Sequence, residues 1–487
     1  MATPAARTPL ADHLPEMPHP ESDADADAVV LGGGIAGIAA ALELLDAGRT
    51  VTLVEARRFL GGRVFSFADA ATGINLDNGQ HVFVTCCTHF QGFLERLGVR
   101  ESWFLQDRLR IPVLSRDGKR GALAASRLPA PFHLAPSFLS YPHLSAVDKI
   151  RVSWGLVKAR LANRYAPDLE EKTFYQWLRE NGQSDRAIRN LWNLVVEPIL
   201  NDNVRDVSAA MGLFVVQDGM LSAKDGANMG YATEALSDAL GEPARNLLER
   251  LGVNLVLGDP VRSIQLSGGA GGGRGPDLAG GAALASGRKV SGRALVSALP
   301  FPALLRALPA GTEGMGSFAN AGYLQWSPIV NAHICYDRPV MDEPFCVFVD
   351  SPLQWVFNHG QTTGQAPRSG GHMVTISVSA AWKHINLSRE AIGAELAAEM
   401  AGVFPEAGNA AVLNICVVKQ REATFRCLPG ANLLRPEPVT PVLNLFLAGE
   451  WTQTGWPSTM EGAVRSGYNA AGAAIDFLKR EADAKTP

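Results

Sequence analysis

Three glycines near the N-terminus stand at a spacing that lets a helix begin very close to a strand, and a glutamate follows them. Gly32, Gly34 and Gly37 form G-x-G-x-x-G between an apolar run and a helical pattern, and Glu55 closes the next apolar run. Glycine permits a tight turn, close backbone approach to a pyrophosphate and close helix–strand packing. The helix N-terminus favours phosphate charge, and the glutamate can accept hydrogen bonds from ribose hydroxyls. The constellation predicts a bound dinucleotide.

The segment that begins at Glu55 indicates which dinucleotide is bound, FAD or NAD. It reads E-A-R-R-F-L-G-G-R and ends at Arg63. It resembles the extended dinucleotide signature of the flavin amine oxidase and phytoene desaturase superfamily, E-A-R-x-x-x-G-G-R. The resemblance implies FAD, with the glycine pair close to the ribityl–phosphate region and Arg63 supplying charge there. Many members carry arginine where this chain has Phe59, so one supporting contact differs.

A second motif lies near the C-terminus. The apolar run 443–448 precedes Gly449 and Glu450, and a loop and a helical pattern follow. This order resembles the C-terminal flavin motif of the same superfamily, in which the acid meets the ribityl chain or pyrophosphate. A helix N-terminus then faces the flavin pyrimidine edge, where it stabilises the negative charge of reduced flavin. The resemblance assigns that second role mainly to backbone N–H groups of Met460, Glu461, Gly462 and Ala463.

The predicted FAD contacts come from four parts of the chain, and Val261 is expected to meet the adenine through its backbone. They are Gly32, Gly34, Ile35, Ala36, Gly37, Glu55, Ala56, Arg57, Gly61, Gly62, Arg63, Gly79, Gln80, His81, Val261, Gly449, Glu450, Met460, Glu461 and Ala463.

Flavin motifs at both ends of the chain require a discontinuous domain. The predicted class is α/β, a Rossmann-like FAD-binding domain of the amine oxidase type with a discontinuous α+β substrate domain. The assigned ranges are 28–115, 231–316 and 431–480 for the FAD domain, 116–230 and 317–430 for the substrate domain, and 1–27 and 481–487 for the tails.

The middle of the chain contains the segments that return to the FAD domain. Residues 251–266 read as two strands, and residues 293–300 read as a strand of the FAD sheet. The glycine-rich run 268–281 predicts a hairpin loop rather than a phosphate loop, because no suitable helix follows it.

Composition limits the alternatives. The chain has 487 residues, of which 47% are apolar and 19% charged, and its net charge is −4, so disorder and a large basic nucleic-acid surface are disfavoured. Six cysteines form no C-x-x-C, which argues against a metal site or a disulfide framework. Cys86 and Cys87 are interpreted as small hydrophobes rather than a redox pair.

The N-terminus has no signal-peptide pattern and no apolar run is long enough to span a membrane, so we expect a cytoplasmic protein.

The segment Asp77–Val82, D-N-G-Q-H-V, indicates the reaction. Together with the C-terminal motif it resembles the hydroxysqualene dehydroxylase branch of the superfamily. The resemblance implies reductive loss of an allylic hydroxyl from a C30 isoprenoid, giving squalene, with hydride from reduced FAD. The expected partners are an isoprenoid lipid and an unidentified electron donor, either NAD(P)H or a redox protein.

Two side chains are the candidate catalytic groups. His81 is a candidate acid or flavin-tuning group. Glu197 lies within the apolar run L-W-N-L-V-V-E-P-I-L, where burial raises the pKa of a carboxyl as a general acid requires. A cationic intermediate needs a dry site. The aromatic residues expected to line an apolar tunnel are Trp192, Phe214, Phe345, Phe348, Trp355 and Phe357.

Three other functions remain open. A phytoene-type desaturase would move hydride in the opposite direction, and an amine oxidase would need polar or cage-forming groups beside the flavin. A prenyl-binding chaperone of the GDP-dissociation-inhibitor type is disfavoured, since such relatives have lost the flavin motifs. The amphipathic segment 143–165 is either an ordinary surface helix or a site of shallow, peripheral contact with the inner face of the membrane.

Overall fold

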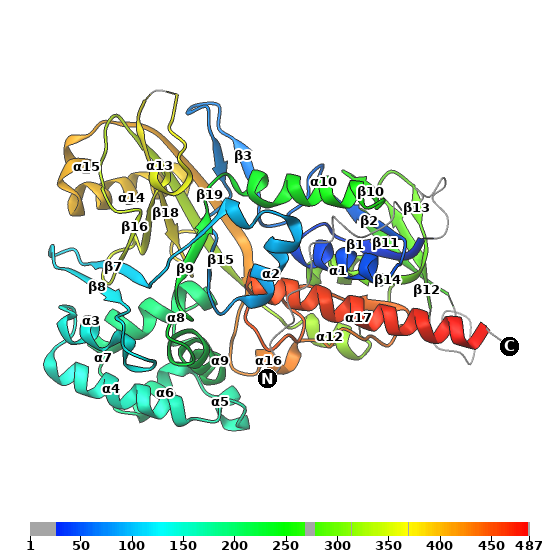
Figure 1. Ribbon diagram of the computed structural model, residues 1–487, viewed down its shortest axis with the longest axis horizontal. Coiled ribbons are helices and arrows are strands. Elements are labelled where there is room, and N and C mark those ends of the chain that lie inside the picture. Colours follow the sequence, from blue (N-terminus) through cyan, green and yellow to red (C-terminus); the bar gives the residue numbers. More distant parts are fainter. Residues whose placement is uncertain (1–25, 268–277, 313, 369, 486–487) are drawn as a thin grey trace.

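The computed structural model describes residues 26–267, 278–312, 314–368 and 370–485 (Figure 1). The elements form two lobes. One lobe contains the parallel sheet with helices α1 and α17, and the other contains a larger mixed sheet with a group of helices beneath it (Figure 1). This arrangement confirms the predicted class.

The first sheet is parallel, in the order β10-β2-β1-β14-β20. Its members are β1 (Ala26–Leu31), β2 (Val51–Glu55), β10 (Asn254–Leu257), β14 (Gly292–Ser297) and β20 (Leu445–Leu447). The central strands are apolar along most of their length because helices cover them, as parallel sheets require. Helices α1 (Ile35–Asp46) and α17 (Met460–Lys485) pack on each other against the sheet. Chain segments from both ends and the middle therefore meet in one sheet.

The second sheet has the order β19-β15-β18-β17-β16-β7-β8. Its strands are β7 (Arg110–Leu114), β8 (Arg120–Ala124), β15 (Trp326–Tyr336), β16 (Phe345–Phe348), β17 (Trp355–Asn358), β18 (His372–Val378) and β19 (Val412–Phe425). The long pair β15–β19 forms one side, and α14 (Arg389–Val403) and α15 (Pro405–Asn409) cover it.

Smaller sheets connect the lobes and flank the first sheet. Strands β5, β9 and β6 form a three-stranded sheet, β3 and β4 form a hairpin, and β11, β12 and β13 form a meander. Their bounds are β3 (Ser66–Ala68), β4 (Asn75–Asp77), β5 (Val82–Val84), β6 (Trp103–Leu105), β9 (Met229–Ala232), β11 (Val261–Ser267), β12 (Leu278–Leu284) and β13 (Lys289–Val290).

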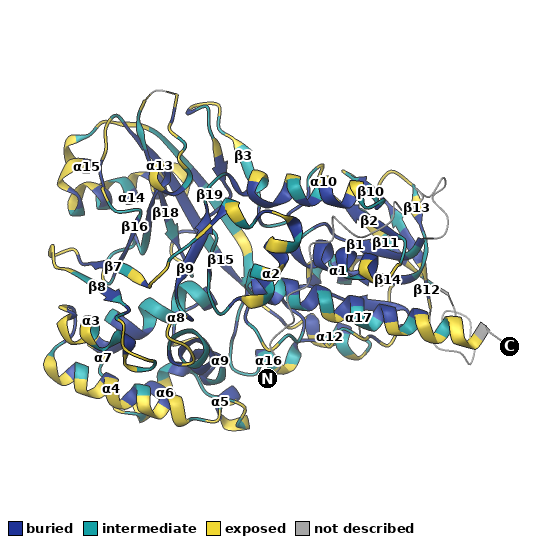
Figure 2. Cartoon of the chain, in the orientation of Figure 1, coloured by how far each residue is buried: buried dark blue, intermediate teal, exposed yellow. Residues whose placement is uncertain are grey.

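The remaining helices belong to the lobe with the second sheet, flank the parallel sheet or connect the two lobes. Many of them border a large apolar core that reaches from the helices beneath the second sheet to one face of the parallel sheet, whereas α2 and α10 pack in the core that contains α1 and α17. Their bounds are α2 (Thr88–Leu97), α3 (Ala135–Ser140), α4 (Ala146–Leu161), α5 (Pro167–Glu171), α6 (Phe174–Glu180), α7 (Asp185–Ala187), α8 (Asn193–Leu200), α9 (Ala209–Phe214), α10 (Glu242–Arg250), α11 (Phe301–Ala307), α12 (Gly316–Ala321), α13 (His359–Thr363) and α16 (Ala431–Leu434). Figure 2 shows that exposed residues are concentrated on the outer surfaces of these helices.

Several predicted boundaries are wrong at the residue level. Strand β7 was assigned to the FAD domain, but it pairs with β16 at Val113 and Val347 in the second sheet. Its partner lies far away in the sequence, so composition cannot reveal the pairing. Strand β1 begins two residues early, since Ala26 is already opposite Gly292. Helix α17 extends into the predicted C-terminal tail as far as Lys485, and Glu481 pairs there with Arg293 at 3.0 Å.

The glycine-rich hairpin prediction is tested only at its edges. Residues 268–277 lie outside the described residues. Strands β11 and β12 on either side of them pair antiparallel, as a hairpin requires, and β12 already begins at Leu278. The strand predicted at 293–300 is β14, and it lies in the first sheet between β1 and β20.

Candidate functional site

The first glycine motif forms a tight turn that Glu55 holds against β2. Oε2 of Glu55 accepts a hydrogen bond of 2.7 Å from the N–H of Gly33, and Oε1 accepts one of 2.9 Å from the N–H of Arg57. A carboxylate has about four lone-pair sites, so both oxygens can still accept from a ribose hydroxyl. Glu55 therefore fixes the turn and remains available to a ligand.

The first turn of α1 is built to receive a phosphate. A Cβ at Gly37 would lie 1.9 Å from the carbonyl oxygen of Gly32, so only glycine fits where the helix meets the strand. The helix begins at Ile35, its N-cap Gly34 has no side chain, and Ala36 follows within the first turn. The first N–H groups of the helix are thus uncapped by a side chain, which suits a pyrophosphate.

The second glycine pair brings Arg63 to the C-terminal motif. The N–H of Gly61 donates to the carbonyl of Gly33 at 2.9 Å, which places Gly62 over Gly34. Nη2 of Arg63 then pairs with Oε2 of Glu450 at 2.5 Å. The two sequence motifs therefore meet in space.

Glu450 leaves one acceptor unused. The residue is buried, and its Oε1 has no hydrogen-bond partner within the described ranges. A buried carboxylate oxygen without a donor costs free energy. The hydroxyl of a ribityl chain is a donor of the right kind, so this site fits FAD. Gly449, with φ of 130°, makes the sharp turn out of β20 that presents Glu450.

The predicted adenine contact, Val261, is the first residue of strand β11, and the loop before it lies at the end of β2. The N–H of Gly258 donates to the carbonyl of Arg57 at 2.8 Å, and that of Asp259 donates to the carbonyl of Glu55 at 3.2 Å. These bonds hold the segment that leads to Val261 next to the end of β2. Ala56 lies between Glu55 and Arg57, the two residues whose carbonyls accept these bonds. The predicted FAD contacts Glu55, Ala56 and Arg57 are therefore next to the segment that leads to Val261.

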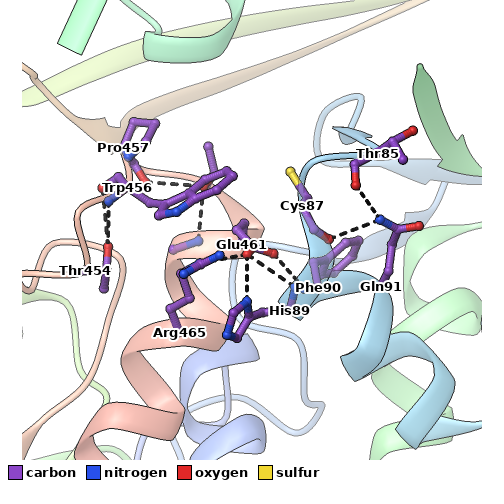
Figure 3. Close-up of polar contacts among 12 residues, drawn as sticks. Thr85, Cys87, His89, Phe90, Gln91, Thr454, Trp456, Pro457, Glu461 and Arg465 are labelled. Atoms are coloured by element: carbon purple, nitrogen blue, oxygen red, sulfur yellow. Dashed lines mark hydrogen bonds and ion pairs between the residues drawn. The ribbon is translucent and has the colours of Figure 1, made fainter. Parts of the chain in front are cut away.

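Glu461 stands in the first turn of α17 but its side chain faces α2 (Figure 3). Its carboxylate accepts hydrogen bonds from the N–H of Phe90 at 2.7 Å and from Nε of Arg465 at 2.7 Å. Burial alone would raise the pKa of Glu461, but the hydrogen bond from His89 and the charge of Arg465 hold the pKa below its usual value. The side chain joins two helices. The N–H of Gly462 donates to Oγ1 of Thr459 at 3.1 Å and that of Ala463 to the carbonyl of Thr459 at 3.0 Å, so of the predicted contacts the backbone N–H groups of Met460 and Glu461 are the ones left for a flavin.

The segment Asp77–Val82 lies on β15, next to Arg63. A Cβ at Gly79 would be 2.6 Å from Nδ2 of Asn331, so glycine is needed at this contact. Nδ2 of Asn78 donates to the carbonyl of Arg63 at 2.7 Å. Gln80 is half-buried in the same loop. The loop is therefore fixed from both sides, by the substrate sheet and by the second glycine motif.

His81 is neutral in this setting. Its Nδ1 donates to the carbonyl oxygen of Gly79 across 2.9 Å. Burial lowers the pKa of His81, the charge of Arg63 lowers it further, and the Gly79 hydrogen bond only partly opposes both effects. Because the ring is neutral with its proton on Nδ1, Nε2 can accept a hydrogen bond or a proton.

Glu197 has the properties of a proton donor. It lies in α8, where it accepts hydrogen bonds from Nδ2 of Asn193 and, at 2.9 Å, from Nε2 of Gln354. Burial raises the pKa of Glu197 to about 7, although both hydrogen bonds oppose the shift. A carboxyl with this pKa is partly protonated at neutral pH.

Backbone strain is concentrated around Glu197. Among the described residues, the non-glycine residues with positive φ are Asn201 (51°), Gln354 (43°) and Ala380 (47°). The N–H of Ala380 donates to Oδ1 of Asn201 at 2.7 Å, and that of its neighbour Ser379 donates to Oε1 of Gln354 at 2.7 Å. Strain of this kind costs about 1–3 kcal/mol per residue and gathers at functional sites.

A continuous set of contacts links Glu197 to the flavin motifs. Asn201, at the C-terminal end of α8, donates from Nδ2 to Oγ1 of Thr424 at 2.8 Å. The preceding residue, Ala423, accepts a hydrogen bond of 2.7 Å from Nη1 of Arg63. The end of β19 thus joins the helix that bears Glu197 to the Arg63–Glu450 pair.

The six predicted tunnel aromatics do not form one lining. Phe345, Trp355 and Phe357 form one cluster, Tyr231 meets Phe345 edge to face, and Val82 packs on this group. Phe345 and Phe348 point to opposite faces of β16 because their spacing is odd.

The other three predicted tunnel aromatics pack elsewhere. Phe348 contacts Phe404 beneath the outer helices. Trp192 packs in the helical core against Phe174, and Phe214 contacts Trp456. For Trp192 and Phe348 the tunnel prediction is wrong.

Sequence reasoning missed Arg435. This buried guanidinium donates from Nη2 to the carbonyl of Glu450 at 3.1 Å and to Oγ1 of Thr454 at 3.0 Å, so it shapes the loop behind Glu450. Burial lowers the pKa of Arg435 to about 10. No spacing rule marks an arginine in L-L-R-P-E-P, and only the fold reveals its role.

The cysteines are free thiols. Cys87 is buried and Cys86 half-buried, at the start of α2. Within the described ranges, no cluster of three His, Cys, Asp or Glu side chains could hold a metal ion.

The comparisons with known proteins agree with this geometry. The family model described as flavin-containing amine oxidoreductase matches residues 35–475. The chain is 28% identical to a hydroxysqualene dehydroxylase of Sinorhizobium fredii, with 92% of this chain and 97% of that protein covered. It is 26% identical to a zeta-carotene desaturase of Synechocystis, with 92% and 96% covered.

Solved structures share the fold. Putrescine oxidase superimposes with a TM-score of 0.67 at 17% identity, covering 93% of this chain and 99% of that one. A reduced UDP-galactopyranose mutase superimposes with a TM-score of 0.65 at 15% identity, covering 95% and 97%. The family match begins directly after Gly34 and spans Gly37, the second glycine motif and the Glu450 site, which fit FAD. The chain belongs to the flavin-containing amine oxidoreductase family, and it is an FAD-dependent oxidoreductase.

Proposed function

We propose that the protein reductively removes an allylic hydroxyl group from a C30 isoprenoid and converts hydroxysqualene to squalene. Relatives with the name hydroxysqualene dehydroxylase, from Sinorhizobium fredii and Rhodopseudomonas palustris, are each 28% identical to this chain. The observation that carries the proposal is Glu197, whose pKa burial raises to about 7. Loss of water from an alcohol needs a proton donor that is still protonated near neutral pH.

The reaction replaces a hydroxyl by hydrogen. Glu197 gives its proton to the hydroxyl oxygen, the C–O bond breaks with its electron pair on oxygen, and water leaves. The electron-deficient allylic carbon gains a hydride and forms a C–H bond. Bound FAD, once reduced by an electron donor such as NAD(P)H or a redox protein, is the source of that hydride. Glu197 then regains a proton from solvent.

Other residues of the chain hold the cofactor and bind the substrate in this proposal. Gly34, Glu55 and the Arg63–Glu450 pair hold the cofactor. The cluster of Tyr231, Phe345 and their neighbours offers an apolar surface to an isoprenoid chain. Such a surface excludes the water that would capture a cation.

One observation favours a second function, desaturation of a polyprenoid. Neutral His81 has Nε2 as a proton acceptor, and desaturation removes a proton and a hydride from adjacent carbons. A zeta-carotene desaturase of Synechocystis and a 15-cis-phytoene desaturase of Synechococcus elongatus are each 26% identical to this chain. In that reaction His81 takes the proton and an external oxidant receives the two electrons.

A single preparation separates these functions. The flavin of the purified protein is reduced with dithionite without oxygen, hydroxysqualene is added, and flavin absorbance and extracted lipids are followed. We expect reoxidation with one squalene per flavin. If the flavin stays reduced and no squalene forms, dehydroxylation of this substrate is excluded. Bleaching of the oxidised protein by phytoene-like polyenes would support desaturation, and bleaching by amines would indicate an amine oxidase.

A further inference from the structure

Helix α4 has apolar side chains on two opposite faces. The inward face carries Val152, Gly155 and Ala159, which are buried. The outward face carries a row that we call the α4 stripe, made of Val147, Ile150, Trp154, Val157 and Leu161. Its members recur every three or four residues, so they line one side of the helix. Ile150 is 72% exposed and Leu161 77%, and the helix lies at the outer edge of the helical lobe (Figure 2).

Cations flank the stripe on both sides. At 100° per residue, Arg151 and Lys158 lie on one flank of the stripe and Lys149 and Arg160 on the other. Nζ of Lys158 lies 4.8 Å from the ring centre of Trp154. The helix contains a single acid, Asp148, and it is turned inward to accept hydrogen bonds from serine hydroxyls. The exposed face is therefore apolar in the middle and positive at both edges.

A second segment extends the stripe. Nζ of Lys149 donates to the carbonyl of Leu139, whose side chain is 68% exposed at the end of α3. Tyr165, just beyond the helix, is 79% exposed and stacks under Arg164. Large exposed apolar residues are thus grouped along one helix in a chain whose net charge is −4.

We propose that the α4 stripe docks the protein on an anionic lipid bilayer, with α4 lying in the plane of the interface. An exposed apolar row bordered by lysine and arginine is the pattern of helices that insert shallowly beside lipid headgroups. Lysine and arginine reach outward to the phosphates while their aliphatic stems cover apolar surface. Within the described ranges no helix is long and apolar enough to cross a membrane, so the contact is with one leaflet.

The charges beside the α4 stripe favour an anionic lipid surface over a protein partner. The flanks carry cations on both sides and no exposed acid, which a lipid surface of uniform negative charge matches along the whole helix. A second copy of the chain would place the same cations against each other. The inference stands on α4 alone and does not depend on the proposed reaction.

Vesicle flotation of the FAD-loaded full chain tests this inference. The vesicles contain phosphatidylcholine alone or phosphatidylcholine with phosphatidylglycerol, and no substrate is present. We expect binding to the anionic vesicles that weakens with salt. The triple variant Ile150→Ser, Trp154→Ser, Leu161→Ser should bind at least about ten-fold less. The variant Arg151→Gln, Lys158→Gln should lose about ten-fold or more on anionic vesicles only.

Matched controls are Tyr323→Ser and Leu433→Ser, which remove side chains of 72% and 74% exposure elsewhere on the surface. They should bind like the unaltered protein. Equal binding by the triple variant and the controls, or no flotation of the unaltered protein, would overturn the inference. Conversion of a dimer to a monomer by the triple variant would instead assign the stripe to a second copy. Failure here leaves the squalene assay unaffected, so the two proposals fail separately.

Discussion

Nε2 of Gln354 donates a hydrogen bond of 2.9 Å to Oε1 of Glu197, although 157 positions separate the two residues in the chain. The other end of the Gln354 amide is fixed, because Oε1 accepts from the N–H of Ser379. The amide therefore can present only its NH₂ group to Glu197. This contact orients the carboxyl and lies in the strained set of residues at the end of α8.

The first prediction concerns proton donation. Glu197→Gln keeps the shape of the side chain but removes the acid. We expect kcat for squalene formation to fall by about 10²–10⁴, as for loss of a general acid, with FAD content unchanged. In the unaltered protein kcat should also fall above about pH 7, where the carboxyl ionises. Glu437→Gln, at an exposed site, is the control. A variant with full activity would remove Glu197 from the mechanism.

The same carboxyl makes stability depend on pH. Burial raises the pKa of Glu197 from 4.5 unfolded to about 7 folded. Between these values the folded state holds a proton that the unfolded state has lost, so this group lowers stability as pH rises. The slope is at most about 1.4 kcal/mol per pH unit.

Thermal unfolding from pH 5 to pH 8 measures this effect. The Tm of Glu197→Gln should rise relative to the unaltered protein across this range, and the difference should level off above about pH 7. A constant difference would mean that Glu197 ionises normally.

The elements around the flavin were predictable because their chemistry is local. The turn at Gly32, the packing at Gly37 and the carboxylate of Glu55 act within one strand–helix–strand unit, so spacing alone specifies them. Strand β7 was misassigned because its partner β16 lies more than two hundred residues away. Arg435 was missed for the same reason, since its partners surround it only after folding.

A third prediction tests the FAD site at Glu450. Its Oε1 has no donor within the described part of the chain, and its Oε2 binds Arg63. Glu450→Leu removes both interactions and leaves Arg63 without its carboxylate partner. We expect FAD to be lost on gel filtration, with the ratio of 450 nm to 280 nm absorbance falling at least about ten-fold, the loss for a buried charged contact. Circular dichroism should stay unchanged. Full flavin content would refute the assignment.

A fourth prediction compares two glycines in helices. A Cβ at Gly37 would lie 1.9 Å from the carbonyl of Gly32, whereas nothing lies within 4 Å of a Cβ at Gly92 in α2. Gly37→Ala should therefore abolish FAD binding and lower Tm. Gly92→Ala should raise stability by up to about 1 kcal/mol, because alanine is the better helix former. Denaturant unfolding and flavin absorbance measure both. Similar behaviour of the two variants would mean that α1 can shift away from β1.

The predicted tunnel aromatics show another difference between expectation and structure. Trp192 was predicted beside the substrate from its type alone, but its indole N–H donates to Gln183 inside the helical core. Aromatic residues serve cores and sites alike, so type cannot separate them. Alternation along β16 does separate Phe345 from Phe348, and this rule could have been applied to the sequence.

The last prediction uses that pair. Phe345 and Phe348 are 3% and 4% exposed on opposite faces of one strand. Phe345 belongs to the cluster with Tyr231, next to Val82, while Phe348 packs on Phe404. Replacing either by leucine should lower the free energy of unfolding by a similar amount, roughly 1–2 kcal/mol. Only Phe345→Leu should raise KM for the isoprenoid, because only that side chain lies on the face we assign to the substrate. Equal KM values for the two variants would place the lipid chain elsewhere.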